Sequence, residues 1–203
     1  MPAFTIVVMK KNRFIQSIRP LVRIFFAGIY VSVLAIVAHT AAFAAQLQTP
    51  APLPKMVQEH IPDGALVGSG QLRVLFWRIY DAELYAPNGQ WQFDGPFALV
   101  VNYLRDISNE TIVTALMKEI RSQGFSDENT LQLWERWLHD VMPSVQIGDR
   151  FIAVSTTDSE TALFHQGEYL GTLADSRFTR YFFNIIFGPD SSYPQLKDQL
   201  LKN

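Results

Sequence analysis

The chain has 203 residues and no cysteine, which excludes disulfides, thiol catalysis and thiolate metal sites. Five of its 17 basic residues precede residue 45, so the remaining 159 residues carry 12 basic and 19 acidic side chains, a net charge of −7. This acidic remainder is long enough for one domain with a proper core but not for two, and its charge argues against nucleic acid as a partner.

The first 44 residues have the three parts of a secretory signal. Basic residues without any acid precede an apolar stretch from Ile24 to Ala38, and small residues follow, ending Ala42-Phe43-Ala44. We expect Sec-type export, to the periplasm or outside the cell, with cleavage after Ala44. Met9, which two lysines follow, is a more ordinary start than Met1. The alternative is an uncleaved anchor in the inner membrane, because about 15 apolar residues is near the lower length for a span.

The next part of the chain predicts a linker and then a β-rich region. A Pro-rich linker with a short helical turn around Lys55 to His60 occupies residues 45–60, and the domain is expected to occupy residues 61–203. Two β-rich stretches fill the segment from Leu66 to Tyr85. After the Asn-Gly turn signal at residues 88–89, the apolar run at residues 97–104 is typical of a buried strand.

The pattern then changes to helical spacing. Ser108 or Asn109 is expected to cap a helix that stops at Gly124, and Ser126 or Asp127 to cap a second helix that ends before Pro143. Strands are predicted at residues 150–156, 161–166 and 168–173. Two final helices are expected at residues 175–187 and 192–200. Strands, two helices, strands and two helices indicate an α+β fold, since no βαβ alternation is present.

With this order of elements, the chain resembles the chalcone isomerase-like superfamily, in particular exported bacterial proteins that carry a chalcone-isomerase-like domain. The resemblance spans residues 66–202 and rests on the order and spacing of five segments: VGSGQLR leading to IYDAELYAP, NYLRDIS, WERWLHDVMPSVQIGDRF, FHQGEYLGTL and FFNIIFGPDSSYPQLKDQLL. It implies an open-faced β-sandwich, in which a large antiparallel sheet carries a layer of helices on one face and a ligand cleft lies between them.

The resemblance also implies site residues. In fatty-acid-binding relatives an early arginine and a nearby tyrosine hold a carboxylate, and these correspond to Arg73 and to Tyr80 or Tyr85. Plant members cyclise a chalcone with a tyrosine and an asparagine at the start of the first helix. Those two positions hold Thr111 and Lys118 here, so the phenol and the amide of the plant enzymes are missing.

The residues themselves allow two interpretations of Arg73. Facing a cleft, its guanidinium would grip a carboxylate or phenolate with two parallel hydrogen bonds, above an apolar floor of Phe76, Val101 and Phe178. Alternatively, Arg73 pairs with an acid such as Asp81 or Asp106 and only supports the sheet.

Arg105 and Asp106 stand together at the join between a strand and a helix. The pair either orients a ligand, which makes Arg105 a further candidate binding residue, or locks the loop at the helix start. Locking is the better account, because an acid near a helix start is favoured by the helix dipole.

Metal and cofactor sites are not expected. The four histidines, at positions 39, 60, 139 and 165, lack the spacing of metal ligands, and no nucleophile elbow, zinc-protease helix or P-loop motif is present.

Three functions remain. The first is a non-catalytic binder of a small amphipathic acid, fatty-acid-like or phenolic. The second is an isomerase or intramolecular lyase, in which Arg73 stabilises an oxyanion and Thr111 relays a proton through water. The third is a ligand-free interaction module. A monomer is expected in each case.

Overall fold

The computed structural model describes residue 53 and residues 55–202, to which every structural statement below refers. From Leu53 onward the chain forms one compact unit, whose hydrophobic clusters consist of its own residues. The predicted signal and its cleavage site lie outside the described residues. Among the helices described, none has the length and apolar character to cross a membrane.

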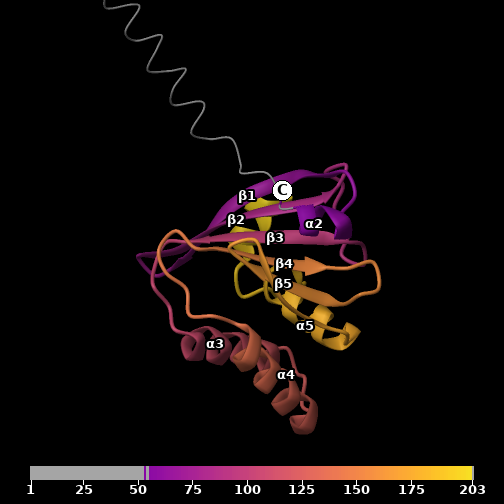
Figure 1. The fold of residues 1–203 in the computed structure, drawn as a ribbon. Helices are drawn as coiled ribbons and strands as arrows, with labels where there is room; N and C mark the ends of the chain where they lie inside the picture. Colours follow the sequence, from indigo (N-terminus) through magenta and orange to yellow (C-terminus); the bar gives the residue numbers. More distant parts are fainter. Residues whose placement is uncertain (1–52, 54, 203) are drawn as a thin grey trace, which may run out of the picture. The chain divides into compact units, whose positions relative to one another are not determined.

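Six strands form one antiparallel sheet in which each strand pairs with its neighbour in sequence (Figure 1). The strands are β1 (Gly64–Val74), β2 (Trp77–Pro87), β3 (Phe97–Tyr103), β4 (Arg150–Ser155), β5 (Thr161–His165) and β6 (Glu168–Leu173). The sheet order β1-β2-β3-β4-β5-β6 is therefore a simple meander, which two helices interrupt between β3 and β4.

The described helices follow the capping signals of the sequence. They are α2 (Lys55–His60), α3 (Asn109–Ser122), α4 (Glu128–Val141), α5 (Ser176–Phe187) and α6 (Pro194–Leu201). The side chains of Ser108, Asp127 and Asp175 each accept a hydrogen bond from a backbone N–H of the first turn of the following helix, as predicted for N-caps. At the start of α6, Pro194 fixes the first helical residue but Tyr193 provides no side-chain cap.

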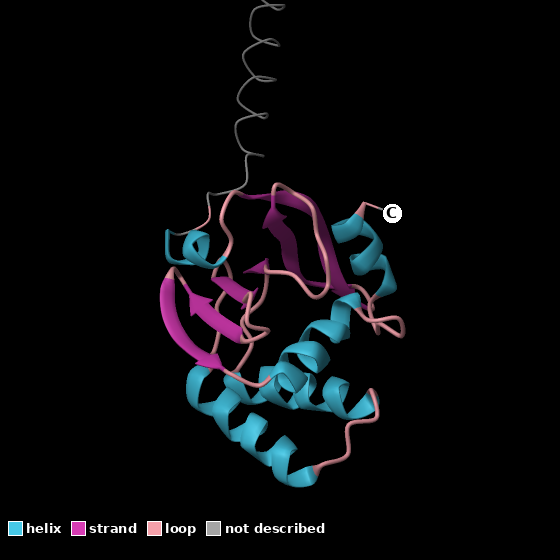
Figure 2. Ribbon diagram, turned by 90° about the vertical axis from the view of Figure 1, so that its right-hand side faces the viewer, coloured by secondary structure: helices cyan, strands magenta, loops and turns pink. Residues whose placement is uncertain are grey.

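One face of the sheet is covered by a helix layer. Figure 2 shows α3, α4 and α5 gathered along this side. Alternate strand residues such as Leu84, Phe97 and Leu99 belong to the larger hydrophobic cluster, which also includes Trp134 and Phe178 of the helices. The Phe97 ring contacts those of Phe183 and Phe187 in α5. The period-2 alternation of a half-buried strand explains why neighbouring residues, such as Ala98 and Val100, belong to the opposite face.

The opposite face has a smaller apolar cluster, which the six-residue helix α2 covers. Val57 of α2 and Ile61 just after it pack against Tyr85, Val100 and Ile152. Both faces of the central strands are thus buried, which accounts for the continuous apolar run of β3.

The predicted apolar floor is only partly right. Val101 and Phe178 lie together in the larger cluster. Phe76, however, stands in the turn between β1 and β2 and is 88% exposed. The sequence interpretation treated Phe76 as part of a strand, whereas the chain reverses at Leu75 and Phe76 and carries both side chains away from the core.

Candidate functional site

A groove of about 590 Å³ lies where the edge strand β1 meets the first turn of α6. Its lining comes from these two elements and from the segment before α6: Gln71, Leu72, Arg73, Ser192, Tyr193, Pro194, Gln195, Leu196 and Gln199. A volume in this range suits a small organic ligand, for which pockets usually measure about 300–1,000 Å³. The predicted anion-binding residue Arg73 is among its lining residues, so this groove is the candidate ligand site.

Two glycines of β1 allow α6 to lie directly on the strand. A Cβ atom at Gly68 would come within 2.3 Å of the backbone oxygen of Leu200, and one at Gly70 within 2.6 Å of the Gln199 side-chain oxygen. The Gly-Ser-Gly sequence is therefore needed for close approach of a helix, one of the roles that glycine serves in strands. This contact fixes the position of the groove.

Arg73 does not face the space between the sheet and the helix layer, contrary to the prediction. Leu72 occupies that position: it pairs with Tyr80, is 7% exposed and belongs to the larger cluster. Arg73, one residue later, points to the opposite face and lies exposed at the rim of the groove. Because side chains alternate along a strand, an error of one residue in register moves an anchor to the wrong face.

A short hydrogen-bond chain holds Arg73 at this rim. Its Nε donates to Gln71 Oε1 at 2.8 Å, and Gln71 Nε2 donates to Asp81 Oδ1 at 2.5 Å. The Gln71 backbone N–H donates to Gln199 Oε1 of α6 at 2.9 Å. Arg73 therefore reaches Asp81 only through a glutamine, and its terminal guanidinium nitrogens make no hydrogen bond to a described residue.

Three tyrosines lie close together on the helix-covered face, and one of them, Tyr193, lines the groove. Tyr80 and Tyr103 are cross-strand partners, with ring centroids 6.0 Å apart and nearly perpendicular planes. Burial raises the pKa of Tyr103 to about 12. The pKa of Tyr80 is also raised, first by burial and then by the proximity of Tyr103 and Tyr193. These phenols are therefore neutral hydrogen-bond donors at neutral pH.

The third tyrosine, Tyr193, links the groove to α3. Its hydroxyl donates to Glu119 Oε1 at 3.5 Å, and Ser192 Oγ donates to Glu119 Oε2 at 2.6 Å. Burial, followed by Glu119, raises the pKa of Tyr193. Sequence reasoning missed Tyr103, Tyr193 and Glu119. The Ser-Ser-Tyr-Pro sequence lies at the predicted start of the last helix and within one segment of the resemblance, and nothing local indicates that it meets α3.

Tyr85 lies on the other face of the sheet from Tyr80. Five residues separate the two, so strand alternation places them on opposite sides. Tyr85 packs in the smaller cluster, and its hydroxyl donates to Glu83 Oε2 at 3.0 Å. Neither of the two predicted tyrosines lines the groove, but Tyr80 is close to Tyr193, which does.

The pair at the end of β3 has separate roles. Asp106 Oδ1 accepts a hydrogen bond of 2.8 Å from the Ile147 N–H and so ties the end of β3 to the loop before β4, whereas the prediction had the pair lock the loop at the helix start. The Arg105 guanidinium lies over the ring of Trp77, 3.9 Å from its centroid. Arg105 is not among the residues that line the groove.

Thr111 is part of a helix cap. It stands in the first turn of α3, where its hydroxyl is 2.8 Å from that of Ser108 and its N–H donates to the same oxygen. Thr111 is not among the residues that line the groove with Arg73. Lys118 is exposed on α3. The two residues of the isomerase hypothesis, Arg73 and Thr111, are therefore not brought together in the groove.

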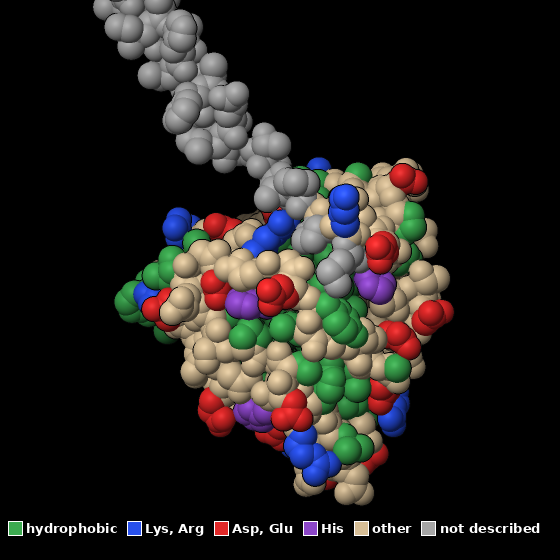
Figure 3. Space-filling model, in the orientation of Figure 1, with side chains coloured by type: hydrophobic (Ala, Val, Ile, Leu, Met, Phe, Trp, Pro, Cys, Tyr) green, Lys and Arg blue, Asp and Glu red, His purple; other side chains and the backbone are tan. Residues whose placement is uncertain are grey.

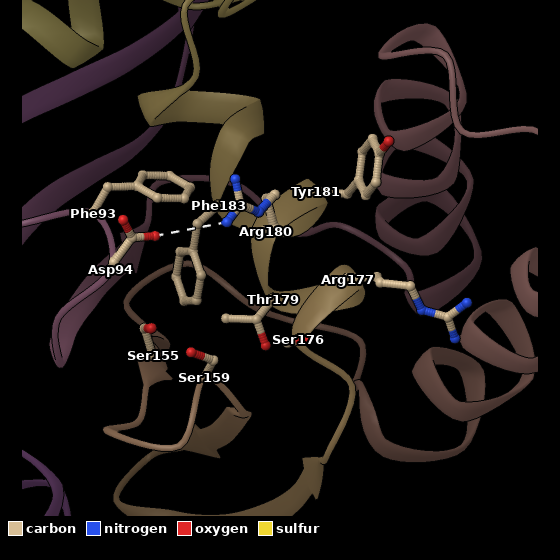
Figure 4. A pocket seen from close by; sticks show the side chains of 10 residues that line it. All are labelled: Phe93, Asp94, Ser155, Ser159, Ser176, Arg177, Thr179, Arg180, Tyr181 and Phe183. Atoms are coloured by element: carbon tan, nitrogen blue, oxygen red, sulfur yellow. Dashed lines mark ion pairs between the residues drawn. The ribbon is translucent and has the colours of Figure 1, made fainter.

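A second, smaller hollow of about 150 Å³ lies beside α5 (Figure 4). Hydroxyl side chains of Ser155 and Thr179 line it, and Arg180 reaches towards Asp94, with 3.8 Å between Nη2 and Oδ1. Arg177 points the other way in Figure 4 and pairs with Asp175. This hollow is too small for most organic ligands and its charges are already paired, so the groove is the stronger candidate.

The three described histidines have structural partners, and that of His60 is the ring of Phe164. His165 Nε2 is 2.9 Å from Asp149 Oδ2 and His139 Nδ1 is 2.9 Å from Asn109 Oδ1. Within the residues that the structure describes, no three His, Asp or Glu side chains are grouped so as to hold a metal ion.

Comparisons with known proteins identify the fold of the chain. Neither the known protein-family models nor the curated protein sequences include a match to this chain. Among solved structures, the chain is similar to a fatty-acid binding protein of Arabidopsis thaliana, with a TM-score of 0.58 and 11% sequence identity, over 76% of this chain and 91% of the plant chain. The antiparallel sheet with its helix layer therefore has the chalcone-isomerase-like fold that the resemblance implied.

Proposed function

We propose that this chain is an exported, non-catalytic binder of a small amphipathic acid, which it holds in the groove between β1 and α6. The observation that carries the proposal is the position of Arg73. Arg73 lines a groove of ligand size together with the first turn of a helix and with Tyr193, whose phenol is neutral at neutral pH. The fatty-acid binding protein of Arabidopsis, with the same fold, supports this class of ligand.

The rim of the groove is suited to an anion. Arg73 offers a guanidinium whose Nε is already fixed by Gln71, so little side-chain freedom is lost when the terminal nitrogens bind a carboxylate or phenolate. The first N–H groups of α6 have no intrahelical acceptor, and Tyr193 caps none of them with its side chain. A negative charge placed here would meet both the cation and the positive end of the helix dipole.

The rest of the groove is suited to an uncharged body. Leu72, Pro194 and Leu196 supply apolar contact, and Tyr193 supplies an aromatic ring. Gln195 and Gln199 lie at the edge as neutral hydrogen-bonding groups. A short hydrocarbon chain or a phenolic ring fits this combination better than a sugar or a nucleotide, because the lining carries a single positive charge.

Catalysis is not part of the proposal. The Thr111 hydroxyl is engaged in the cap of α3, away from the groove, and the nearest ionisable partner of Tyr193 is Glu119, which already accepts two hydrogen bonds. The export signal at residues 1–44 extends the proposal to a binder that works in the periplasm or outside the cell.

Native mass spectrometry of residues 45–203, purified without detergent, tests the proposal. We expect a co-purifying acid, or uptake of added palmitate or p-coumarate, and binding at least about tenfold weaker in Arg73→Ala, since a hydrogen bond to a charged group contributes about 1.5–3 kcal/mol. Arg78→Ala is the matched control, because Arg78 is exposed opposite Arg73 on the hairpin but does not line the groove. Equal binding by the parent and Arg73→Ala, or none by the parent, would contradict the proposal.

A further inference from the structure

The turn between β1 and β2 exposes a run of large apolar side chains. Val74, Leu75, Phe76 and Trp77 are 44%, 82%, 88% and 54% exposed, and they account for half of the large exposed hydrophobic residues in the described chain. Figure 3 shows hydrophobic side chains at the projecting left end of the molecule, where Figure 1 places this turn. We call these four residues the hairpin tip. Isolated exposed leucines are ordinary, whereas a contiguous apolar projection marks an interaction site.

The backbone of the hairpin tip is strained at Leu75, where a glycine or asparagine would relieve the strain. Leu75 has a φ of 55°, in the left-handed region that favours glycine or asparagine in two-residue hairpin turns. A branched, 82% exposed leucine at this position gains no packing within the protein to offset the strain. Strain of this kind is common where a side chain serves a function.

Arginines surround the hairpin tip. Arg73 and Arg78 are opposite each other at its base, and Arg105 lies over the ring of Trp77. No acidic residue occurs from Arg73 to Tyr80, and the acids that directly follow Tyr80 and Arg105 in sequence, Asp81 and Asp106, are hydrogen-bonded to Gln71 and to the Ile147 N–H. A local group of three cations therefore stands out on a domain whose net charge is −7.

We propose that the hairpin tip inserts into the headgroup layer of an anionic lipid bilayer. Leu75 and Phe76 would enter the boundary between headgroups and acyl chains, while Trp77 would lie at headgroup level, where tryptophan is enriched. The three arginines would remain at the surface and contact lipid phosphates, since anionic membranes attract cations that lie within a Debye length. A domain with a net charge of −7 is repelled by such a surface overall, whereas the three arginines of the tip are attracted to it, which favours contact through the tip.

The inference does not depend on an occupied groove, but the two sites are adjacent. Arg73 belongs both to the rim of the groove and to the base of the hairpin tip. A protein docked through the tip would hold the open rim of its groove close to the lipid surface, where amphipathic acids are concentrated.

Vesicle co-sedimentation tests this inference without added ligand. Residues 45–203 are suitable, because the unit that begins at Leu53 contains its own hydrophobic clusters and the apolar N-terminal stretch is absent. We expect binding to vesicles of phosphatidylcholine with 30% phosphatidylglycerol and at least tenfold weaker binding to phosphatidylcholine alone. The double variant Leu75→Asn/Phe76→Ser should reduce binding to the anionic vesicles at least tenfold, because it removes the inserting side chains. The turn itself should be preserved, since asparagine tolerates the positive φ at position 75.

Two further variants separate the charge contribution from general effects. Arg78→Gln/Arg105→Gln should lower binding several-fold at low salt and much less at 0.5 M salt. Leu133→Asn removes a 58% exposed leucine of α4 and should bind like the parent. The proposal is overturned if the parent does not bind anionic vesicles or if the Leu75/Phe76 variant binds equally well. Tip-dependent self-association in sedimentation velocity, without vesicle binding, would instead identify a second copy of the chain as the partner.

Discussion

The two faces of the sheet differ in what covers them. One face packs against the helix layer, and its residues Leu72, Tyr80 and Phe97 are part of the larger hydrophobic cluster. The other face is covered over its central strands by the short helix α2, and towards the hairpin it carries the polar chain of Arg73, Gln71 and Asp81. Stability therefore depends mainly on the helix-covered face, while the uncovered end of the other face is free to present charge.

Two phenylalanines that were predicted to share one apolar floor should behave in opposite ways. Phe178 is fully buried in the larger cluster, so Phe178→Ala should lower the free energy of unfolding by about 3–5 kcal/mol. Phe76→Ala, at the exposed hairpin tip, should change it by less than about 0.5 kcal/mol. Urea unfolding of both variants provides the comparison. Similar losses in the two variants would mean that the tip packs against the protein in solution.

The contact between β1 and α6 can be tested with two glycines. Gly68→Ala should lower the free energy of unfolding by about 3 kcal/mol, because the new methyl group meets the backbone of Leu200 and α6 must move. Gly95→Ala is the matched control, since its Cβ has only an ordinary contact at 3.5 Å. Calorimetry should show a clear fall in Tm for Gly68→Ala alone. If Gly68→Ala melts like the parent, α6 is not seated on the strand as described.

Local signals in the sequence were sufficient to predict most of the elements. N-caps such as Ser108 and Asp127, and the apolar run of β3, depend on interactions within a few residues, and the structure confirms them. The antiparallel sheet with helices followed from the order of these elements. Phe76 was misplaced because a turn that contains Leu and Phe lacks the glycine or asparagine by which such turns are recognised.

The site was harder to predict because it depends on register and on distant contacts. Leu72 and Arg73 are adjacent, and only the pairing of β1 with β2 determines which of them faces the helices. Tyr193 and Glu119 are separated by 74 residues, and the folded chain alone brings them together. Neither relationship is encoded in a short motif.

The buried tyrosines of the helix-covered face predict a loss of stability at alkaline pH. Burial raises the pKa of Tyr103 to about 12, so the folded protein keeps a proton that the unfolded chain releases above pH of about 10. The contribution of this group to stability is complete below pH of about 10 and is lost as the pH rises towards 12, by roughly 3 kcal/mol in all.

Urea unfolding at pH 8 and pH 11 measures this effect. Tyr103→Phe should match the parent at pH 8, since the Tyr103 hydroxyl makes no hydrogen bond to a described residue, and should lose less stability at pH 11. Phe182→Leu, a conservative change beside the same cluster, is a control that leaves the alkaline loss intact. An identical pH dependence in Tyr103→Phe and the parent would show that this phenol is not buried in solution.

The smallest effect distinguishes Tyr80 from Tyr85, one on each face of the sheet. The Tyr85 hydroxyl donates to Glu83 Oε2 at 3.0 Å, so Tyr85→Phe should lower the free energy of unfolding by about 1 kcal/mol. The Tyr80 hydroxyl has no hydrogen-bond partner among the described residues, so Tyr80→Phe should leave the stability of the empty protein nearly unchanged.

If the groove binds an acid, however, Tyr80→Phe should weaken that binding several-fold, whereas Tyr85→Phe should not affect it. Chemical unfolding and palmitate titration of the two variants measure both effects. The reverse pattern would move the ligand to the face that carries α2, because only there does Tyr85 present its hydroxyl.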